Sequence, residues 1–66
     1  MSLFTSKEKE ILGLISIGLT TKEIAARLNI SHHTVETHRK NLLRKGEVKN
    51  SAQLVLMALS QQIIVA

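Results

Sequence analysis

Residues 21 to 40 read TKEIAARLNISHHTVETHRK, which is typical of two short helices joined by a tight turn at Asn29. Asn tolerates the positive φ that such a turn often needs better than most residues do. Ala25 supplies the small side chain that two crossing helices need. Apolar residues lie on both sides of the turn, where the helices must bury them: Ile24, Leu28, Ile30 and Val35. The stretch therefore predicts a helix-turn-helix.

Polar residues mark where helices begin along the whole chain, which has no proline and no strand-like alternation. Three segments, 5–8, 20–23 and 50–53, fit a capping box, in which two side chains satisfy free backbone N–H groups. Ser31 is a further N-cap. We predict an all-α, bundle-like domain of four helices, near 6–17, 21–28, 32–45 and 51–62.

Glycines mark two of the expected helix ends. Gly18 follows the first helix and Gly46 the third, and glycine is the usual residue at such ends. Gly13 lies inside the first helix, where it costs about 1 kcal/mol relative to alanine. We therefore expect a close helix crossing at Gly13.

Composition restricts the class of protein. The 66 residues predict one domain with a small core, and the absence of cysteine excludes disulfides and thiolate metal sites. There is no signal peptide and no apolar run of membrane-spanning length, so we expect a soluble, cytoplasmic protein. Whether residues 1–3 are native is left open. Nine Lys and Arg against five Glu give a net charge of +4, which suits a polyanionic partner.

The helix predicted at 32–45 has one polar, basic face. At about 100° per residue, Val35 and Leu42 share the core side. The opposite side carries groups that can hydrogen-bond to base edges, with Glu36 on its flank: Thr37, Lys40, Asn41 and Arg44. A merely solvated face is the alternative.

In the DNA-binding interpretation, the contacts divide into two sets. We predict base contacts from Glu36, Thr37, Lys40 and Asn41. Contacts to the phosphate backbone are expected from Thr20, Thr21, Lys22, Ser31, Thr34, Arg44 and Lys45. Arg39 lies closer to the core side, so a pair with Glu8 or Glu23 is an alternative to DNA contact.

The sequence gives little support for a metal site or an enzyme active site. The three histidines lack a cysteine, an aspartate or a further convergent ligand, so we expect neither a metal nor a cofactor. No set of nucleophile, base and orienting residue is recognisable, which predicts that the domain is not an enzyme.

Several segments in order resemble the DNA-binding domain of LuxR-type (FixJ/GerE-type) regulators, from Phe4 to Ile64. Residues 4–8, FTSKE, are similar to the LTxRE that opens this family, and residues 18–25, GLTTKEIA, to its GLSNKEIA. Residues 34–39, TVETHR, match its TVxxHR. The chain departs at residues 45–47, where KGE replaces the common KLG, and at Glu36, where Lys is common. These departures leave the end of the third helix and the preferred bases open.

The resemblance implies a bacterial transcriptional regulator of which residues 1–66 form the DNA-binding domain, as the C-terminal part of a longer chain. It implies base reading at Glu36, Thr37 and Lys40, dimerisation through the fourth helix, and RNA polymerase as a candidate partner. The helix near 51–62 is apolar nearly all round, and we place a weak homodimer contact at Gln53, Leu56 and Met57. The competing account buries Leu56 and Met57 against the first helix.

The sequence thus predicts sequence-specific binding of double-stranded DNA for transcriptional regulation. A sigma-factor-like promoter-binding helix-turn-helix is an alternative in the same class. A helical protein-interaction module that has lost DNA binding is an alternative in another class, and it would lack the salt dependence of DNA binding.

Overall fold

A computed structural model describes residues 4–64 of the chain, so residues 1–3, whose origin the sequence left open, lie outside it. The described residues form four α-helices and no strand, which confirms the predicted all-α class. The helices are α1 (Ser6–Ser16), α2 (Thr21–Leu28), α3 (His32–Gly46) and α4 (Ser51–Ser60). The predicted bounds are right for α2, while α1 and α4 end one and two residues earlier than predicted.

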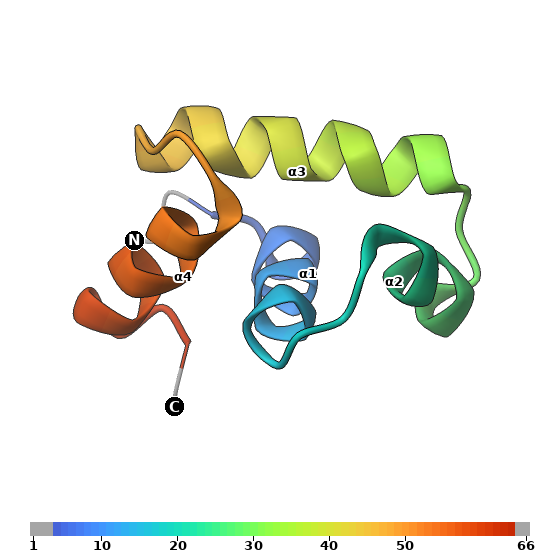
Figure 1. Cartoon of the computed structure of the whole chain (residues 1–66), viewed down its shortest axis with the longest axis horizontal. Coiled ribbons are helices and arrows are strands. Elements are labelled where there is room, and N and C mark those ends of the chain that lie inside the picture. The colour runs from blue at the N-terminus through green and yellow to red at the C-terminus, as the bar shows by residue number, and fades with distance from the viewer. Residues whose placement is uncertain (1–3, 65–66) are drawn as a thin grey trace.

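The long helix α3 lies across the other three. Figure 1 shows α2, α1 and α4 in a row on one side of α3, and α3 contacts each of them. The opposite long side of α3 has no other described element against it (Figure 1). The arrangement therefore exposes one complete face of α3.

Local hydrogen bonds start the helices as predicted. In α1 the Glu8 N–H donates to Thr5 Oγ1 (3.1 Å), and the Thr5 N–H donates to Glu8 Oε1 (2.9 Å). Residues 20–23 make the same reciprocal pair at the start of α2. The third predicted box is only half right. Asn50 accepts from the Gln53 N–H (2.9 Å), but the Gln53 side chain accepts from the Lys49 N–H (2.9 Å).

A residue with positive φ follows each of the four described helices, and after α4 it is Gln62 at φ +59°. Gly18 follows α1 at φ +97°, and Asn29 follows α2 at φ +55°, as predicted for both positions. The third helix was predicted to end at residue 45, just before Gly46; α3 instead includes Gly46 as its last residue, and Glu47 takes the left-handed position at φ +55°. Met57 explains the change: a Cβ on Gly46 would lie 2.8 Å from Met57 Cε. The lack of a side chain at Gly46 therefore makes room for Met57, and a different residue, Glu47, adopts the left-handed conformation that follows the helix.

Replacing Glu47 with Gly should stabilise the domain by about 1 kcal/mol, because glycine adopts the left-handed conformation without strain. Chemical denaturation of the wild type and the variant measures the change. Glu47→Ala is the matched control, since alanine loses the same carboxylate but keeps the Cβ. If alanine stabilised the domain as much as glycine, charge rather than backbone strain would be responsible.

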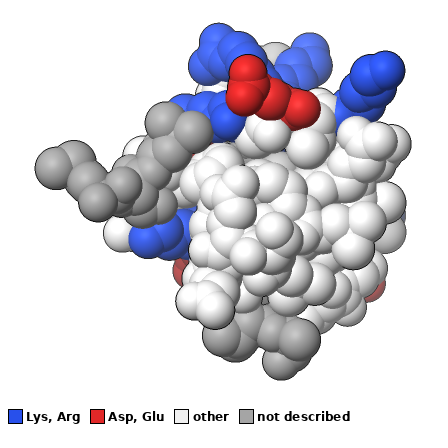
Figure 2. Space-filling view, turned by 90° about the vertical axis from the view of Figure 1, so that its left-hand side faces the viewer, with Lys and Arg blue, Asp and Glu red and all other residues white. Residues whose placement is uncertain are grey.

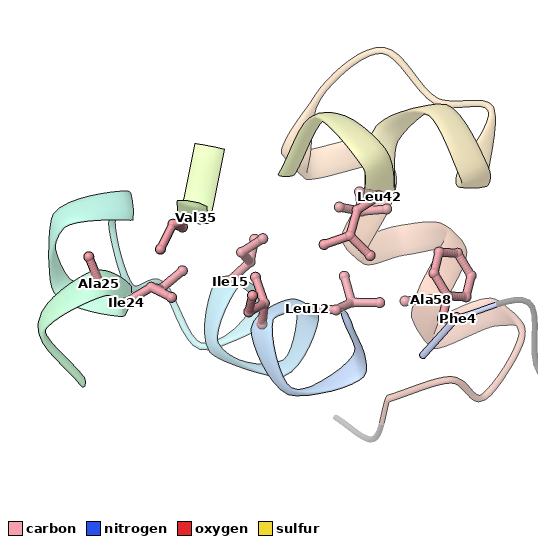
Figure 3. Close-up of a cluster of buried hydrophobic side chains, with 10 residues drawn as sticks. Phe4, Leu12, Ile15, Ile24, Ala25, Val35, Leu42 and Ala58 are labelled. Carbon is pink, nitrogen blue, oxygen red and sulfur yellow. The ribbon is translucent and has the colours of Figure 1, made fainter. Parts of the chain in front are cut away.

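The core lies where α1 meets the other three helices, and Figure 3 shows its side chains converging from all of them. Val35 and Ile24 are fully buried at the contact of α3 with α2, as predicted for the helix-turn-helix. Leu42 continues this side of α3 toward α4. Burial of one side of α3 is what fixes the orientation of its outer face.

Gly13 has no packing role in the described structure. A Cβ built on it meets nothing within 4 Å, so the expected close helix crossing was wrong. Gly13→Ala should therefore stabilise the domain by about 1 kcal/mol, since alanine is the better helix former. Thermal denaturation measures this gain. A loss of stability would mean that the position tolerates no methyl group, against the open space seen here.

Candidate nucleic-acid interface

The outer face of α3 is the candidate interface. Ser31 caps the helix, accepting a hydrogen bond from the Thr34 N–H (3.0 Å), so the face begins at a well-defined first turn. Thr37 and Lys40 are exposed on it, and Glu36 and Asn41 are half-buried. None of the four predicted base-contact residues is therefore buried in the core, and their contacts with DNA stay predictions.

Two of these four side chains already have partners within α3. Thr37 Oγ1 donates to the His33 carbonyl (3.1 Å), and Asn41 Oδ1 accepts from Arg44 Nη2 (3.2 Å). Glu36 and Lys40 make no hydrogen bond or ion pair with any described residue. The face therefore presents one free carboxylate and one free ammonium group.

The predicted phosphate contacts lie at helix starts and on the outer face. Thr20, Lys22 and Ser31 are exposed at or beside the first turns of α2 and α3, and Thr21 and Thr34 are half-buried there. The Ser31 and Thr34 hydroxyls are hydrogen-bonded to each other (2.7 Å). Arg44 is exposed near the end of α3.

Lys45 has a different partner from the one that the sequence suggested. Its ammonium group lies 2.7 Å from Glu8 Oε1 and 2.9 Å from Oε2, which joins the end of α3 to the start of α1. The Glu8 side chain is only 6% exposed and that of Lys45 27%. The ion pair therefore gives Lys45 a structural role, and a phosphate contact from its ammonium would compete with Glu8. Sequence reasoning missed this pair because no periodic pattern links residues 37 positions apart.

The environment of Glu8 favours its charged form. Burial raises the pKa of this carboxyl group, but hydrogen bonds from Lys45 and Thr5 and the charge of Lys45 outweigh burial. The pKa of Glu8 is therefore held below its ordinary value, and this carboxyl group is ionised at neutral pH.

Arg39 does not form the ion pair suggested for it. Its Nη2 donates to Ser51 Oγ (2.6 Å), which links α3 to the first turn of α4. Both suggested partners are already engaged, since Glu8 binds Lys45 and Glu23 caps α2. Arg39 therefore positions α4 against α3.

The outward side of α4 is uncharged, unlike the outer face of α3. No Lys, Arg, Asp or Glu occurs between residues 50 and 64, and Figure 2 shows a broad uncharged surface on this side of the domain. Leu56 is 67% exposed, and Gln53 is exposed one turn earlier. Met57 is half-buried, with its methyl group against Gly46. Of the three predicted dimer residues, Leu56 is thus the most available to a partner.

Residues 4–64 show neither a metal-binding cluster nor a membrane-spanning helix. No three His, Cys, Asp or Glu side chains come together there in a way that would hold a metal ion. No helix in that range is both long and apolar enough to cross a membrane. The two faces described above are therefore the candidates for function.

Comparisons with known proteins agree with this geometry. The family model described as bacterial regulatory proteins, luxR family, matches residues 2–58. The transcriptional regulatory protein MctR of Rhizobium johnstonii is 47% identical over 60 residues, which are 91% of this chain and 28% of MctR. The CsgBAC operon transcriptional regulatory protein of Escherichia coli is 49% identical over 57 residues, which are 86% of this chain and 26% of that protein. The chain thus spans about a quarter of the length of these curated relatives.

Solved structures share the arrangement of the helices. The transcription factor GerE superposes with a TM-score of 0.92 at 34% identity, over 98% of this chain and 97% of GerE. The response regulator ChrA of a heme-sensing two-component system superposes with a TM-score of 0.91 at 33% identity, over 97% of this chain and 32% of ChrA. The chain belongs to the LuxR family of bacterial regulatory proteins, and its helix-turn-helix is a DNA-binding domain for transcription regulation.

Proposed function

We propose that the domain places α3 in the major groove of double-stranded DNA and reads bases with Glu36, Thr37, Lys40 and Asn41. The observation that carries this proposal is the complete uncovered side of α3, which bears two charged groups without a partner in the described structure. A helix is about 10–12 Å across with its side chains, which matches the width of the major groove of about 12 Å. Lys40 would donate to guanine, and Glu36 would accept from cytosine.

The phosphate contacts in this proposal come from residues flanking the base contacts. Hydroxyl groups, backbone N–H groups at helix starts and cations commonly fix a protein on the DNA backbone. We assign this role to six residues: Thr20, Thr21, Lys22, Ser31, Thr34 and Arg44. Lys45 stays a seventh candidate, although its ammonium also binds Glu8.

Titration into duplex DNA tests the proposal. Affinity for a random duplex should fall steeply as salt rises, because bound cations release counterions from the phosphates. Lys40→Ala should weaken binding to a selected site by about 1–3 kcal/mol without lowering thermal stability, since Lys40 is exposed. Lys9→Ala is the control, because it removes the same charge from an exposed position on α1. Binding without salt dependence, or an equal effect of both variants, would contradict the placement of α3.

We also propose a weak homodimer through the uncharged side of α4, with Leu56 at its centre and Gln53 and Met57 beside it. Leu56 is exposed, and α4 itself carries no charged residue that would have to be desolvated. Two copies on half-sites about one helical turn apart would read more sequence than one recognition helix can.

Leu56→Glu tests the dimer. The variant should stay folded, because Leu56 is exposed, and should lose cooperative binding to a duplex with two half-sites. Ile17→Glu is the matched control, since Ile17 is equally exposed, at 67%, but follows α1. Met57→Glu is a poorer test because Met57 also packs against Gly46. Unaltered cooperativity in Leu56→Glu would place the dimer elsewhere.

The proposal for the whole protein follows from the relatives. Because the chain spans about a quarter of their length, we propose that it is the C-terminal, DNA-binding part of a longer regulator. The bacterial cytoplasm is the proposed location, and RNA polymerase is a proposed partner. Pull-down of RNA polymerase with the DNA-bound domain tests the last point.

A further inference from the structure

We propose that Glu36 sets the sequence selectivity of this domain by requiring a cytosine and by repelling duplexes that lack one at the same place. This inference rests on the proposed position of α3 in the major groove. It assigns to Glu36 a role opposite to that of the cations on the same face. The cations would raise affinity for any duplex, whereas the carboxylate would lower it for most duplexes.

The first observation is that Glu36 is not neutralised by its own chain. Lys40 follows it by four residues, the orientation that favours a Glu–Lys pair on a helix. The two side chains nevertheless form no ion pair, and the Glu36 carboxylate has no hydrogen bond to any described residue. Glu36 is also half-buried, so part of its side chain lies against the rest of the domain.

The consequence is an energetic conflict when DNA covers α3. The carboxylate loses water and comes close to phosphates of its own charge, and both effects oppose binding. Only a hydrogen-bond donor on a base edge offsets them. Cytosine presents its amino group as a lone donor in the major groove, whereas adenine places an acceptor beside its amino group and guanine presents only acceptors. A carboxylate therefore favours cytosine.

Spacing along α3 extends the prediction to a second base. Four residues of helix rise separate Glu36 from Lys40, about 6 Å. Successive base pairs rise about 3.4 Å, so the two side chains reach positions about two base pairs apart. Lys40 favours guanine. The favoured half-site thus carries a cytosine and a guanine at about this separation.

In vitro selection from a random-sequence duplex library tests the inference with the wild type, Glu36→Ala and Glu36→Gln. The wild type should select cytosine at one position by about tenfold over other bases. Glu36→Ala should lose that preference and bind random duplex about twofold or more tightly at low salt. Glu36→Gln should shift the preference at the same position to adenine, which glutamine reads through one donor and one acceptor.

Glu10→Gln is the matched control, because it removes the same charge from an exposed residue of α1, on the side away from the core. It should leave base preference and random-duplex affinity unchanged. If Glu36→Ala kept the cytosine preference, or bound random duplex no more tightly than the wild type, the inference would be overturned while DNA binding itself stood. Wild-type protein that bound no duplex in a salt-dependent way would overturn the proposed function as well. Thermal denaturation checks that each variant is folded, and glutamine, which has the shape of glutamate, covers the case in which alanine is not tolerated.

Discussion

Val35→Asp should unfold the domain rather than selectively abolish DNA binding. Val35 is fully buried where α3 crosses α2, facing Ile24, so the new carboxylate would have neither water nor a cation beside it (Figure 3). An unpaired buried charge costs more than about 4 kcal/mol, whereas a domain of this size rarely has more than about 3–5 kcal/mol of stability. Far-UV circular dichroism should show loss of helix at room temperature.

Val35→Ala separates the two parts of this effect. It removes two methyl groups without adding charge, so it should cost about 1–2 kcal/mol and leave a folded domain with a lower melting temperature. A Val35→Asp variant that melted like the wild type would show that the crossing of α2 and α3 opens enough to hydrate a carboxylate.

The second large effect is expected at the ion pair between Glu8 and Lys45. Glu8→Gln keeps a side chain that can complete the capping box with Thr5, but it leaves the Lys45 ammonium without its partner. Breaking a buried pair from one side costs about 3 kcal/mol, and the partial exposure of Lys45 reduces this to about 2 kcal/mol. Urea denaturation of Glu8→Gln measures the loss.

The double variant Glu8→Gln with Lys45→Met provides the control. It removes both charges and keeps apolar packing of the long side chain, so it should recover much of the stability lost in Glu8→Gln. A double variant less stable than either single variant would mean that the two residues stabilise the domain independently.

Acid should weaken the same contact. The pKa of Glu8 is lowered from its ordinary value of 4.5 on folding, so the unfolded chain takes up the proton first. The stability that the pair contributes is complete above pH about 4.5 and is lost as pH falls through the lower pKa of the folded state. The exposed Glu23 also makes stability fall in acid, because the hydrogen bond from the Thr20 backbone N–H lowers its pKa in the folded state. Melting temperatures measured between pH 7 and pH 3 should fall less in Glu8→Gln than in the wild type.

The sequence predicted those features that depend on neighbours three or four residues apart. The caps at Thr5 and Thr20 and the left-handed turn at Asn29 follow from short-range chemistry, and the structure confirms them. The outward position of Thr37 and Lys40 follows from helical periodicity once Val35 and Leu42 are assigned to the core. Their contacts with DNA stay predictions.

Features that depend on segments far apart were missed. The pairing of Lys45 with Glu8 and the bond from Arg39 to Ser51 require knowing how α3 lies on α1 and α4. Gly46 was assigned to a helix end because glycine is common there, but Met57 of another helix occupies the space beside it. In each case the role suggested by neighbours in sequence differs from the contact that the residue makes with another helix.

The contact between Gly46 and Met57 couples the side chains that these two positions can carry. A methyl group at position 46 would fall 2.8 Å from the end of the Met57 side chain, which would have to swing away from α3. Leu56, the residue before Met57 on α4, is exposed. A substitution at position 46, at the end of α3, would therefore change the position of a side chain on α4. Whether a lineage tolerates a side chain at position 46 depends on which residue it already carries at position 57.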